Sequence, residues 1–352
     1  MNQDPADLPV ILLYNMDRGW PSEDKKEMMD MAQGLAAGLT REGHPVEITS
    51  VEDDRLDKVM SRYDPDHSIV FNWCEEVPGI PRSSALVAGA LESLGFTFTG
   101  ADSSALSFSQ DKPAVKDRLA RDQIPTPRWQ VFQPEEPVEW DCFPAIVKPA
   151  YEHYSYGITH EAVVHTGREL SQRVGQITGE FHQPVLVEDF IDGREFHVGI
   201  AGNGRLQVFP IAEMDFSAMR EDNCRLCTYD SKFTPASSDY QMIQLRLPAS
   251  LSAREKSRLE KTALAAYRAT GCRDYARLDI RERDGTFYVL DVNPNADISP
   301  DTSLLLAAEL AGYSYGQFGS LLVKLAAHRH PRLSRQPKKQ LQAVMPAVAL
   351  AD

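Results

Sequence analysis

The chain has 352 residues, of which 42% are hydrophobic and 25% are charged, and its formal net charge at pH 7 is −14. This composition is typical of a folded protein of two or three domains. The negative charge disfavours nucleic acid as a partner, because affinity for the phosphate backbone depends on Lys and Arg, and no apolar run reaches the ~20 residues that a membrane span requires.

The polar, acidic N-terminus shows no signal-peptide pattern. The five cysteines, an odd number, are typical of reduced thiols. These two features predict a cytoplasmic location. Cys224 and Cys227 have C-x-x-C spacing, but no second pair of ligands lies nearby, so ordinary thiols are favoured over a metal or redox site.

The first 105 residues alternate between short apolar runs and helical patterns, which predicts an open α/β domain with a parallel sheet. Strands are expected near residues 9–14, 46–49 and 68–71, and helices over residues 22–41 and 83–94. Ligands of such sheets bind beyond the carboxyl ends of the strands. Those ends carry Asn15–Trp20 and Asn72–Glu76 in this chain.

Two lysines stand at the ends of predicted elements in the middle of the chain. Lys112 follows Asp111, a good N-cap, and begins a helix that runs to about residue 121. A cation in the first turn opposes the helix dipole unless an anion docks there; the alternative is a lysine that points into solvent. Lys148 ends an apolar strand that Pro149 stops.

The remaining elements are read from apolar spacing and turn residues. An aromatic loop over residues 150–157 precedes a helix over 167–178, a strand over 185–191, a turn at Asp192-Gly193, an alternating strand over 194–200, a loop over 214–235, and helices over 252–270, 301–312 and 315–328.

A β-hairpin is predicted over residues 276–295, where two alternating runs flank Asp284-Gly285. A two-residue turn would place Asp279 and Asp291 on opposite faces of the ribbon, because the side-chain period is two. A three-residue loop, 283–285, with Gly285 left-handed in a bulge would place them on one face. We therefore predict the three-residue loop and a shared face.

On that face Asp279 and Asp291 would stand beside Arg277 and Asn293. Two bare carboxylates would repel each other and raise each other's pKa. Mg²⁺, which prefers carboxylate and carbonyl oxygens together with substrate phosphates, resolves this conflict. The alternative is a solvated hairpin face of alternating charge.

The sequence contains neither G-x-x-x-x-G-K-[ST] nor a G-x-G-x-x-G after a strand, so P-loop and Rossmann chemistry have no support. Several short motifs between about residues 71 and 325 instead resemble, in this order, the ATP-grasp superfamily and more closely its D-alanine–D-alanine ligases. The motifs are Phe71-Asn72, Leu91-Glu92-x-Leu94-Gly95-x-x-x-Thr99-Gly100, Asp111-Lys112-x-x-x-Lys116, Ile124-Pro-Thr-Pro127, Val147-Lys148-Pro149, Glu188-x-x-Ile191-x-Gly193-x-Glu195-Phe196, Arg277-x-Asp279 and Asp291-Val-Asn293-Pro-Asn295.

The resemblance implies an ATP-grasp fold behind the N-terminal parallel sheet, α/β in class and α+β in its C-terminal part. It implies an N-terminal domain over residues 1–105, a central subdomain over 106–187, a C-terminal subdomain over 188–330 and a tail over 331–352. It also implies a homodimer that acts on a small acid and a small amine.

The resemblance also implies a role for each matching residue. Lys112 and Lys148 would hold the α- and β-phosphates of ATP, and Lys232 the γ-phosphate. Further nucleotide contacts would come from Glu188, Asp189, Phe190 and Ile191 around the adenine and from Glu195 at the ribose hydroxyls. Asp279, Asp291 and Asn293 would hold one or two Mg²⁺ ions, with Mn²⁺ as an alternative, and the catalytic residues would be Arg277, Lys232 and Ser155.

The implied reaction has two steps. A carboxylate attacks the γ-phosphate to give an acyl phosphate, and an amine then displaces phosphate. Positioning and charge neutralisation are most of what phosphoryl transfer requires. Loops 150–157 and 214–233 would close over the site and keep water from the acyl phosphate.

The part of the motif set that binds the amino acids in the ligases differs here. The His-Gly of the ligases is Cys74-Glu75, the phosphate lid is aromatic and includes Tyr154, the tyrosine expected after Lys232 is Phe233, and the glycine expected beyond Asn293 falls near Asp297. Glu23 takes the place of the glutamate that holds the first amino group, or is an ordinary acid of the first helical turn. Glu75, with Asp17 and Glu76, would grip a substrate ammonium, or these are surface acids.

Three functions follow as competing hypotheses. The first is an ATP-dependent ligase that joins an amino acid to a small acid other than D-alanine. The second is a true D-alanine–D-alanine ligase with a changed pocket. The third is a nucleotide-binding protein without ligase turnover, against which the joint presence of the lysines and the metal ligands argues. A biotin-dependent carboxylase is disfavoured because no Met-Lys-Met motif is present.

Overall fold

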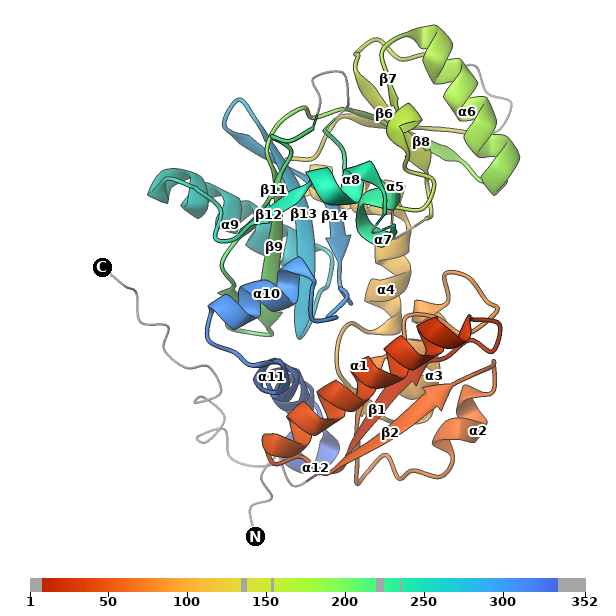
Figure 1. Cartoon of the computed structure of the whole chain (residues 1–352), viewed down its shortest axis with the longest axis vertical. Coiled ribbons are helices and arrows are strands. Elements are labelled where there is room, and N and C mark those ends of the chain that lie inside the picture. Colours follow the sequence, from red (N-terminus) through yellow and green to blue (C-terminus); the bar gives the residue numbers. More distant parts are fainter. Residues whose placement is uncertain (1–7, 134–137, 153–154, 220–224, 235, 335–352) are drawn as a thin grey trace.

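Three β-sheets divide the chain in the computed structural model, which describes residues 8–133, 138–152, 155–219, 225–234 and 236–334 (Figure 1). One sheet is parallel and belongs to the N-terminal part. The other two are antiparallel and follow it in the sequence. Among the helices of these ranges, none has both the length and the apolar character needed to span a bilayer.

The N-terminal sheet confirms the predicted open α/β arrangement. Its four strands are parallel and lie in the order β2 (Val46–Val51), β1 (Val10–Asn15), β3 (Ile69–Trp73) and β4 (Thr97–Phe98). Helices α1 (Ser22–Arg41), α2 (Leu56–Met60) and α3 (Ser84–Ser93) connect them. Every residue of β1 and β3 is buried, which is why these strands are continuous apolar runs in the sequence.

Two helices lead from this sheet to the middle one: α4 (Ser103–Gln110) and α5 (Lys112–Arg121). The middle sheet is antiparallel, with the order β5 (Trp129–Phe132), β8 (Val185–Asp189), β6 (Ala145–Pro149) and β7 (Val163–Val164). Helix α6 (Gly167–Phe181) packs on it through Leu170, Val174 and Ile177, and a short 3₁₀ turn, η2 (His160–Ala162), precedes β7.

The largest sheet contains the predicted hairpin. Its order is β12 (Gln244–Arg246), β11 (Ala212–Asp215), β9 (Glu195–Gly202), β13 (Tyr275–Arg283) and β14 (Thr286–Asn293), with β10 (Leu206–Val208) also paired to β9. Helix α9 (Ala253–Ala269) packs against β9, β13 and β14, and its N-terminus has a capping box between Ser252 and Glu255. The short helices α7 (Asp230–Phe233) and α8 (Ser238–Met242) lie between the middle and the N-terminal sheets in Figure 1.

Two sequence-based expectations for this region are wrong. The chain does not return at Asp192-Gly193 as a hairpin, because β8 belongs to the middle sheet and β9 to the largest one. All eight residues of β9 are buried, so the strand is central and not half exposed. The segment 214–235, expected to be a loop, begins with the end of β11 and contains α7.

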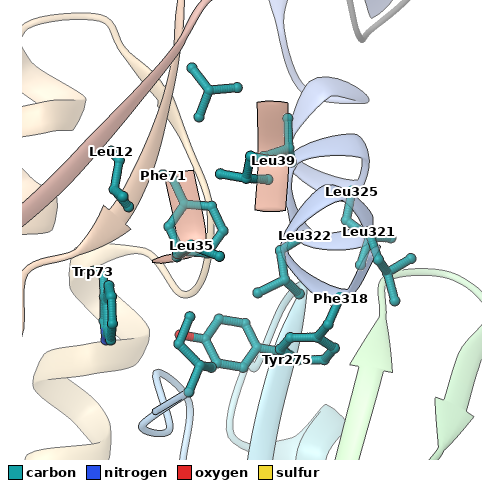
Figure 2. Close-up of a cluster of buried hydrophobic side chains, with 14 of the residues drawn as sticks. Leu12, Leu35, Leu39, Phe71, Trp73, Tyr275, Phe318, Leu321, Leu322 and Leu325 are labelled. Atoms are coloured by element: carbon teal, nitrogen blue, oxygen red, sulfur yellow. The ribbon is translucent and has the colours of Figure 1, made fainter. Parts of the chain in front are cut away.

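The C-terminal helices α10 (Ser303–Leu310) and α11 (Tyr315–Ala327) return to the N-terminal sheet. Figure 2 shows Phe318, Leu322 and Leu325 of α11 facing Leu35 and Leu39 of α1, with Phe71 and Tyr275 completing the cluster. This shared core fixes β13 relative to the N-terminal sheet. The last described element is α12 (Pro331–Ser334).

The division into residues 1–105, 106–187, 188–330 and a tail remains a proposal. The three sheets follow it closely, except that β8 (Val185–Asp189) crosses the boundary at 187/188 and places that end of the central subdomain a few residues later. Most of the tail lies outside the described residues.

The close crossing of α1 and α11 leads to a test of this shared core. A Cβ atom on Gly316 would lie 2.5 Å from the carbonyl oxygen of Gly38. We expect Gly316→Ala to lower the free energy of unfolding by about 1–3 kcal/mol, because backbone must move to relieve the overlap. Thermal or urea unfolding measures the effect.

Gly34 is the matched control, since it lies in α1, the helix that Gly316 approaches, and has no atom within 4 Å of its own Cβ position. Gly34→Ala is expected to stabilise the protein by roughly 0.5–1 kcal/mol through helix propensity. Equal effects of the two substitutions would contradict the packing described here.

Candidate active site

The turn of the β13–β14 hairpin differs from the prediction. It has two residues, Asp284 and Gly285, and both have positive φ angles, 52° and 72°. Positive φ at both positions is typical of a type I′ turn, for which Asp-Gly is a preferred pair. The expected three-residue loop is therefore wrong.

The predicted shared face is nevertheless present. Asp279 pairs directly with Asp291, whereas Ile280 pairs with Val289, so Leu290 is an extra residue and forms a β-bulge in β14. The bulge shifts the register by one and returns the carboxylates to the same side. The Val289 N–H donates to the carbonyl oxygen of Pro125 (2.8 Å), and its own carbonyl accepts from Thr126 (2.9 Å).

A cluster of charged groups covers this face. The Arg277 guanidinium donates to both oxygens of Asp279, from Nε at 2.8 Å and from Nη2 at 3.1 Å. The Asn293 carboxamide lies 3.4 Å from Oδ2 of Asp279. Nζ of Lys112 lies 3.4 Å from Oδ2 of Asp291. Burial alone would lower the pKa of Arg277, but Asp279 and Asp291 raise it, so this residue stays a cation.

Lys112 is therefore not the solvent-directed lysine of the alternative interpretation. It is the first residue of α5, its side chain is 8% exposed, and Asp111 caps the helix by accepting from the Ala114 N–H at 2.9 Å. The predicted cap is confirmed. The lysine thus extends from the positive end of α5 to a carboxylate of the largest sheet.

Next to this face, Glu188 is buried between two lysines. Its carboxylate lies 2.6 Å from Nζ of Lys148 and 2.8 Å from Nζ of Lys116, and its side chain is 1% exposed. Burial by itself would raise the pKa of Glu188, but the two lysines lower it below its usual range. Burial lowers the pKa of Lys116 to about 8, although Glu188 acts in the opposite direction. Lys148 of β6, Glu188 of β8 and Lys116 of α5 thus form a buried cluster in which one carboxylate compensates two lysines.

The residues expected to contact the adenine and the ribose surround a buried arginine. The Arg281 guanidinium donates to Glu195 (2.7 Å) and to the carbonyl oxygen of Ile191 (2.9 Å), and it lies 5.0 Å from the ring centre of Phe190. It also donates to the carbonyl of Arg225. Burial alone would raise the pKa of Glu195, yet Arg281 lowers it well below its usual range. Asp189, at the end of β8, lies 3.4 Å from Nε of Arg128.

The two segments expected to close over the site contact each other. The Tyr229 N–H donates to the carbonyl oxygen of Ile158 (3.1 Å), and the rings of Tyr156 and Tyr229 are 6.1 Å apart. Gly157 packs against Pro149, which directly follows Lys148. Ser155 lies in this turn with a φ angle of 59°, and its carbonyl accepts from the Ile158 N–H.

For three predicted residues of these segments, the structure describes the backbone only or does not describe the residue at all. Lys232 and Phe233 lie in α7, and their side chains are outside the described part of the structure. Tyr154 lies outside the described residues altogether. Their roles stay predictions.

Two of the candidate substrate residues, Glu75 and Asp297, adjoin the Arg277 end of the face. Burial raises the pKa of Tyr275, and the charges of Glu75 and Asp297 act in the same direction. Asp297 also adds to the effect of Asp279 and Asp291 on the pKa of Arg277. Oδ1 of Asp297 accepts from the backbone N–H (2.8 Å) and the hydroxyl (2.7 Å) of Ser299. The Glu75 N–H donates to Asn15 at the end of β1. Both acids thus lie where the N-terminal and largest sheets meet.

Glu23 and Cys74 have different environments. Glu23 is exposed and lines an open surface cavity of about 470 Å³ together with Met31, Pro300 and Tyr315. Cys74 is 3% exposed, and burial raises the pKa of its thiol far above the usual range, so this sulfur is not a nucleophile at neutral pH.

The donor set of the hairpin face fits a divalent cation. Within the described ranges, no three His, Cys, Asp or Glu side chains converge as a protein-only metal centre requires. Instead two facing carboxylates and a carboxamide, all oxygen donors, stand beside lysines that suit phosphates. Mg²⁺ is bound in this way, through one or two carboxylates with substrate phosphates and water.

Sequence reasoning missed Lys116, Arg281 and His197 at this site. Lys116 is part of the Asp111-Lys112 motif, and helical spacing could have placed it on the face of Lys112. Arg281 shares its face with Arg277 and Asp279 through the period of two along β13. No local signal identifies His197, which lies next to Asp279 only because β9 and β13 pair.

Comparisons with known proteins agree with this arrangement. The profile of the family described as D-ala D-ala ligase C-terminus matches residues 119–324. The protein y4sG of Sinorhizobium fredii is 30% identical over 307 residues, which are 85% of this chain and 88% of that protein. The D-alanine–D-alanine ligase of Gluconobacter oxydans is 27% identical over 315 residues, 88% of this chain and 98% of the ligase.

The crystal structure of the D-alanine–D-alanine ligase of Bacillus anthracis complexed with ATP superposes with a TM-score of 0.71. The match covers 92% of this chain and 99% of that one, at 21% identity. The fold is therefore shared along nearly the whole chain, which confirms the ATP-grasp prediction.

The buried Lys116–Glu188–Lys148 cluster yields a test of stability. We expect Glu188→Gln to reduce the free energy of unfolding at pH 7 by about 3–5 kcal/mol, because two buried cations lose their counter-charge. The folded-state pKa of Glu188 lies below its ordinary value, so this contribution is complete above pH ~4.3 and is lost as pH falls through the folded-state pKa. Unfolding curves at several pH values measure it.

Asp122 serves as the control, because its ion pair with Arg118 (2.7 Å) lies on the surface at the C-terminal end of α5. Asp122→Asn should change stability little, since exposed pairs contribute little. A Glu188→Gln protein as stable as wild type would show that the cluster does not stabilise the fold.

Proposed function

Because this chain belongs to the D-alanine–D-alanine ligase family of ATP-grasp proteins, we propose that it is an ATP-dependent, ADP-forming carboxylate–amine ligase. The observation that carries the proposal is the hairpin face: Asp279 opposite Asp291, with Arg277 and Asn293 beside them and Lys112 at 3.4 Å. This set can bind a cation–triphosphate complex and a negatively charged transition state, which are the requirements of phosphoryl transfer.

In this proposal the nucleotide binds between the middle and the largest sheets, next to the Lys116–Glu188–Lys148 cluster. Lys112 and Lys148 contact the α- and β-phosphates, and their present partners, Asp291 and Glu188, orient them. The backbone after Glu188, including Asp189, lines the adenine, and the apolar side chains of Phe190 and Ile191 contact it. Glu195, held by Arg281 on one oxygen, accepts from the ribose hydroxyls with the other.

Asp279, Asp291 and Asn293 would hold one or two Mg²⁺ ions, and Mn²⁺ would serve as a substitute. When bound, the ions neutralise the phosphate oxygens and leave the γ-phosphorus open to attack. Arg277 leaves its pair with Asp279 and contacts the phosphoryl group in transfer and the oxyanion of the next step. Lys232, on α7, is proposed to contact the γ-phosphate.

The proposed reaction has two balanced steps. A substrate carboxylate oxygen bonds to the γ-phosphorus as the bond to the β,γ-bridging oxygen breaks, which gives ADP and an acyl phosphate. An amine nitrogen then bonds to the acyl carbon, the C–O bond to phosphate breaks, and the nitrogen loses a proton, which gives an amide and phosphate. Segments 150–157 and 214–233, which contact each other through Tyr156 and Tyr229, are proposed to exclude water from the acyl phosphate, and Ser155 is proposed to act there.

We propose further that the enzyme joins an amino acid to a small acid, and that this pair of substrates is not D-alanine with D-alanine. Four positions support this. Cys74-Glu75, Phe233 and Asp297 replace the groups that the ligases carry there, and an acid at 297 favours a cationic group near Arg277. Sites built with different hydrogen-bond partners can discriminate between substrates by several powers of ten. Glu75 and Asp297 are proposed to contact the substrate ammonium.

The second candidate is a D-alanine–D-alanine ligase, and the relatives of Gluconobacter oxydans and Desulforudis audaxviator with that name favour it. The latter is 30% identical over 249 residues, 69% of this chain and 77% of the ligase. A homodimer in the cytoplasm stays a prediction for either candidate.

Release of ADP from ATP, measured with panels of small acids and amines, tests the proposal. We expect ADP formation that requires one acid, one amine and Mg²⁺. No stimulation by any acid would contradict ligase function, and stimulation by D-alanine alone would favour the second candidate.

Asp291 provides a test of the metal assignment. We expect Asp291→Ala to reduce turnover by at least about 10²-fold, because the cation loses a carboxylate ligand at the transferring phosphate. The side chain is 30% exposed, so the thermal midpoint should change little. Glu309→Gln, at an exposed position of α10, is the control. Unchanged turnover of Asp291→Ala would refute the assignment.

Asp297 provides a test of the substrate assignment. Asp297→Asn keeps the oxygen that accepts from Ser299 but removes the charge. We expect kcat/KM for the amine to fall about 10–150-fold, the equivalent of one charged hydrogen bond, while KM for ATP stays constant. A parallel rise in KM for ATP would show that Asp297 acts on the nucleotide instead.

A further inference from the structure

His197 lies next to the hairpin face and has no role in the mechanism above. It is on β9 directly opposite Asp279 in the antiparallel ladder, and it is 5% exposed. Glu195 is two residues before it on the same strand, so both side chains lie on the face of Asp279. The imidazole therefore stands between a proposed ribose ligand and a proposed metal ligand.

One ring nitrogen of His197 is anchored from outside the sheet. Nδ1 lies 2.9 Å from Oγ of Ser303, the first residue of α10. When the Ser303 hydroxyl donates to Nδ1, the neutral ring carries its hydrogen on Nε2. In that tautomer the Ser303 hydroxyl fixes the direction of the ring and leaves Nε2 as its donor.

The other nitrogen, Nε2, is buried and makes no hydrogen bond. It lies 3.8 Å from Oδ1 of Asp279 and 3.8 Å from Oε1 of Glu195, just beyond hydrogen-bond distance of each. A buried donor without an acceptor is unfavourable. A small rotation of either carboxylate would satisfy it.

The two oxygens of Asp279 face different strands. Oδ2 is on the side of β14, where the Asn293 carboxamide lies at 3.4 Å, and Oδ1 is on the side of β9, toward His197. In the present structure Arg277 occupies both oxygens. When Arg277 moves to the phosphoryl group, both oxygens lose their hydrogen bond from its guanidinium.

We propose that His197 is a positioning residue for the metal-binding carboxylate: its Nε2–H donates to Oδ1 of Asp279 while Oδ2 takes the divalent cation. This inference rests on the proposed function, since it assumes that Asp279 binds the cation. A hydrogen bond to the far oxygen orients a ligating carboxylate, and loss of such a partner typically weakens metal binding 10–100-fold.

Binding of Mn²⁺ in the presence of ADP, followed by the electron paramagnetic resonance signal of free Mn²⁺, tests the proposal. His197→Leu removes the donor, and His197→Gln keeps an N–H near the position of Nε2. We expect a Kd for Mn²⁺ that rises 10–100-fold in His197→Leu and by less than about threefold in His197→Gln. Ser303→Ala should lie between them, because the ring loses its anchor.

Adenosine is the control ligand for general damage to the site, because it has no phosphate for a cation to contact. Its affinity should be the same in wild type and His197→Leu. An equal loss of affinity for adenosine and for Mn²⁺–ADP would indicate general damage and would overturn the proposal, as would a Kd for Mn²⁺ in His197→Leu within threefold of wild type.

If His197→Leu does not fold, His197→Asn replaces it, because its shorter carboxamide cannot reach Asp279 whereas that of His197→Gln can. Equal Mn²⁺ affinities of the Asn and Gln variants would then overturn the proposal. Failure of the proposed function looks different: wild type itself would bind no Mn²⁺ with ADP.

Discussion

Two carboxylates held directly opposite each other on neighbouring strands are the constraint on which this site depends. Like charges in that position are unfavourable, and Asp279 and Asp291 are a directly opposed pair. Every cation nearby acts on this charge. Arg277 chelates one carboxylate, and Lys112 reaches the other from the start of α5. Those cations are also the groups that a triphosphate requires, so the proposed nucleotide-binding residues are paired with the proposed metal-binding residues.

The hairpin shows what a sequence can and cannot determine. Asp284-Gly285 is a strong signal for a two-residue turn, and the turn has two residues. The chemistry of the acids indicated a shared face, and the face is shared. A two-residue turn and a shared face of the two acids are compatible only if β14 has a bulge at Leu290. The local sequence does not predict this bulge. The bulge depends on bonds from Val289 to Pro125 and Thr126, over 160 residues away in the chain.

The same distinction applies to the rest of the molecule. The N-terminal sheet was predictable because its central strands β1 and β3 are buried on both faces and read as continuous apolar runs. The assignment of β8 and β9 to different sheets was not predictable, because the turn signal at Asp192-Gly193 between them suits a hairpin equally well. Motif residues such as Lys148 could be found from the sequence, whereas Arg281 and His197 acquire their partners only through strand pairing.

The nucleotide and substrate halves of the site differ in how they are held. In the proposed nucleotide half, strand residues such as Lys148 are fixed by sheet register and by buried charge pairs such as Lys148–Glu188, and Lys112 is fixed at the start of α5. The substrate half consists of loops: Glu75 follows β3, and Asp297 lies in a loop that Asn295 ties to the N-terminal part by accepting from the Ala101 N–H at 2.8 Å. A change at position 75 or 297 therefore leaves the register of β13 and β14 intact. Substrate choice can change in such a scaffold while the phosphoryl-transfer geometry stays the same.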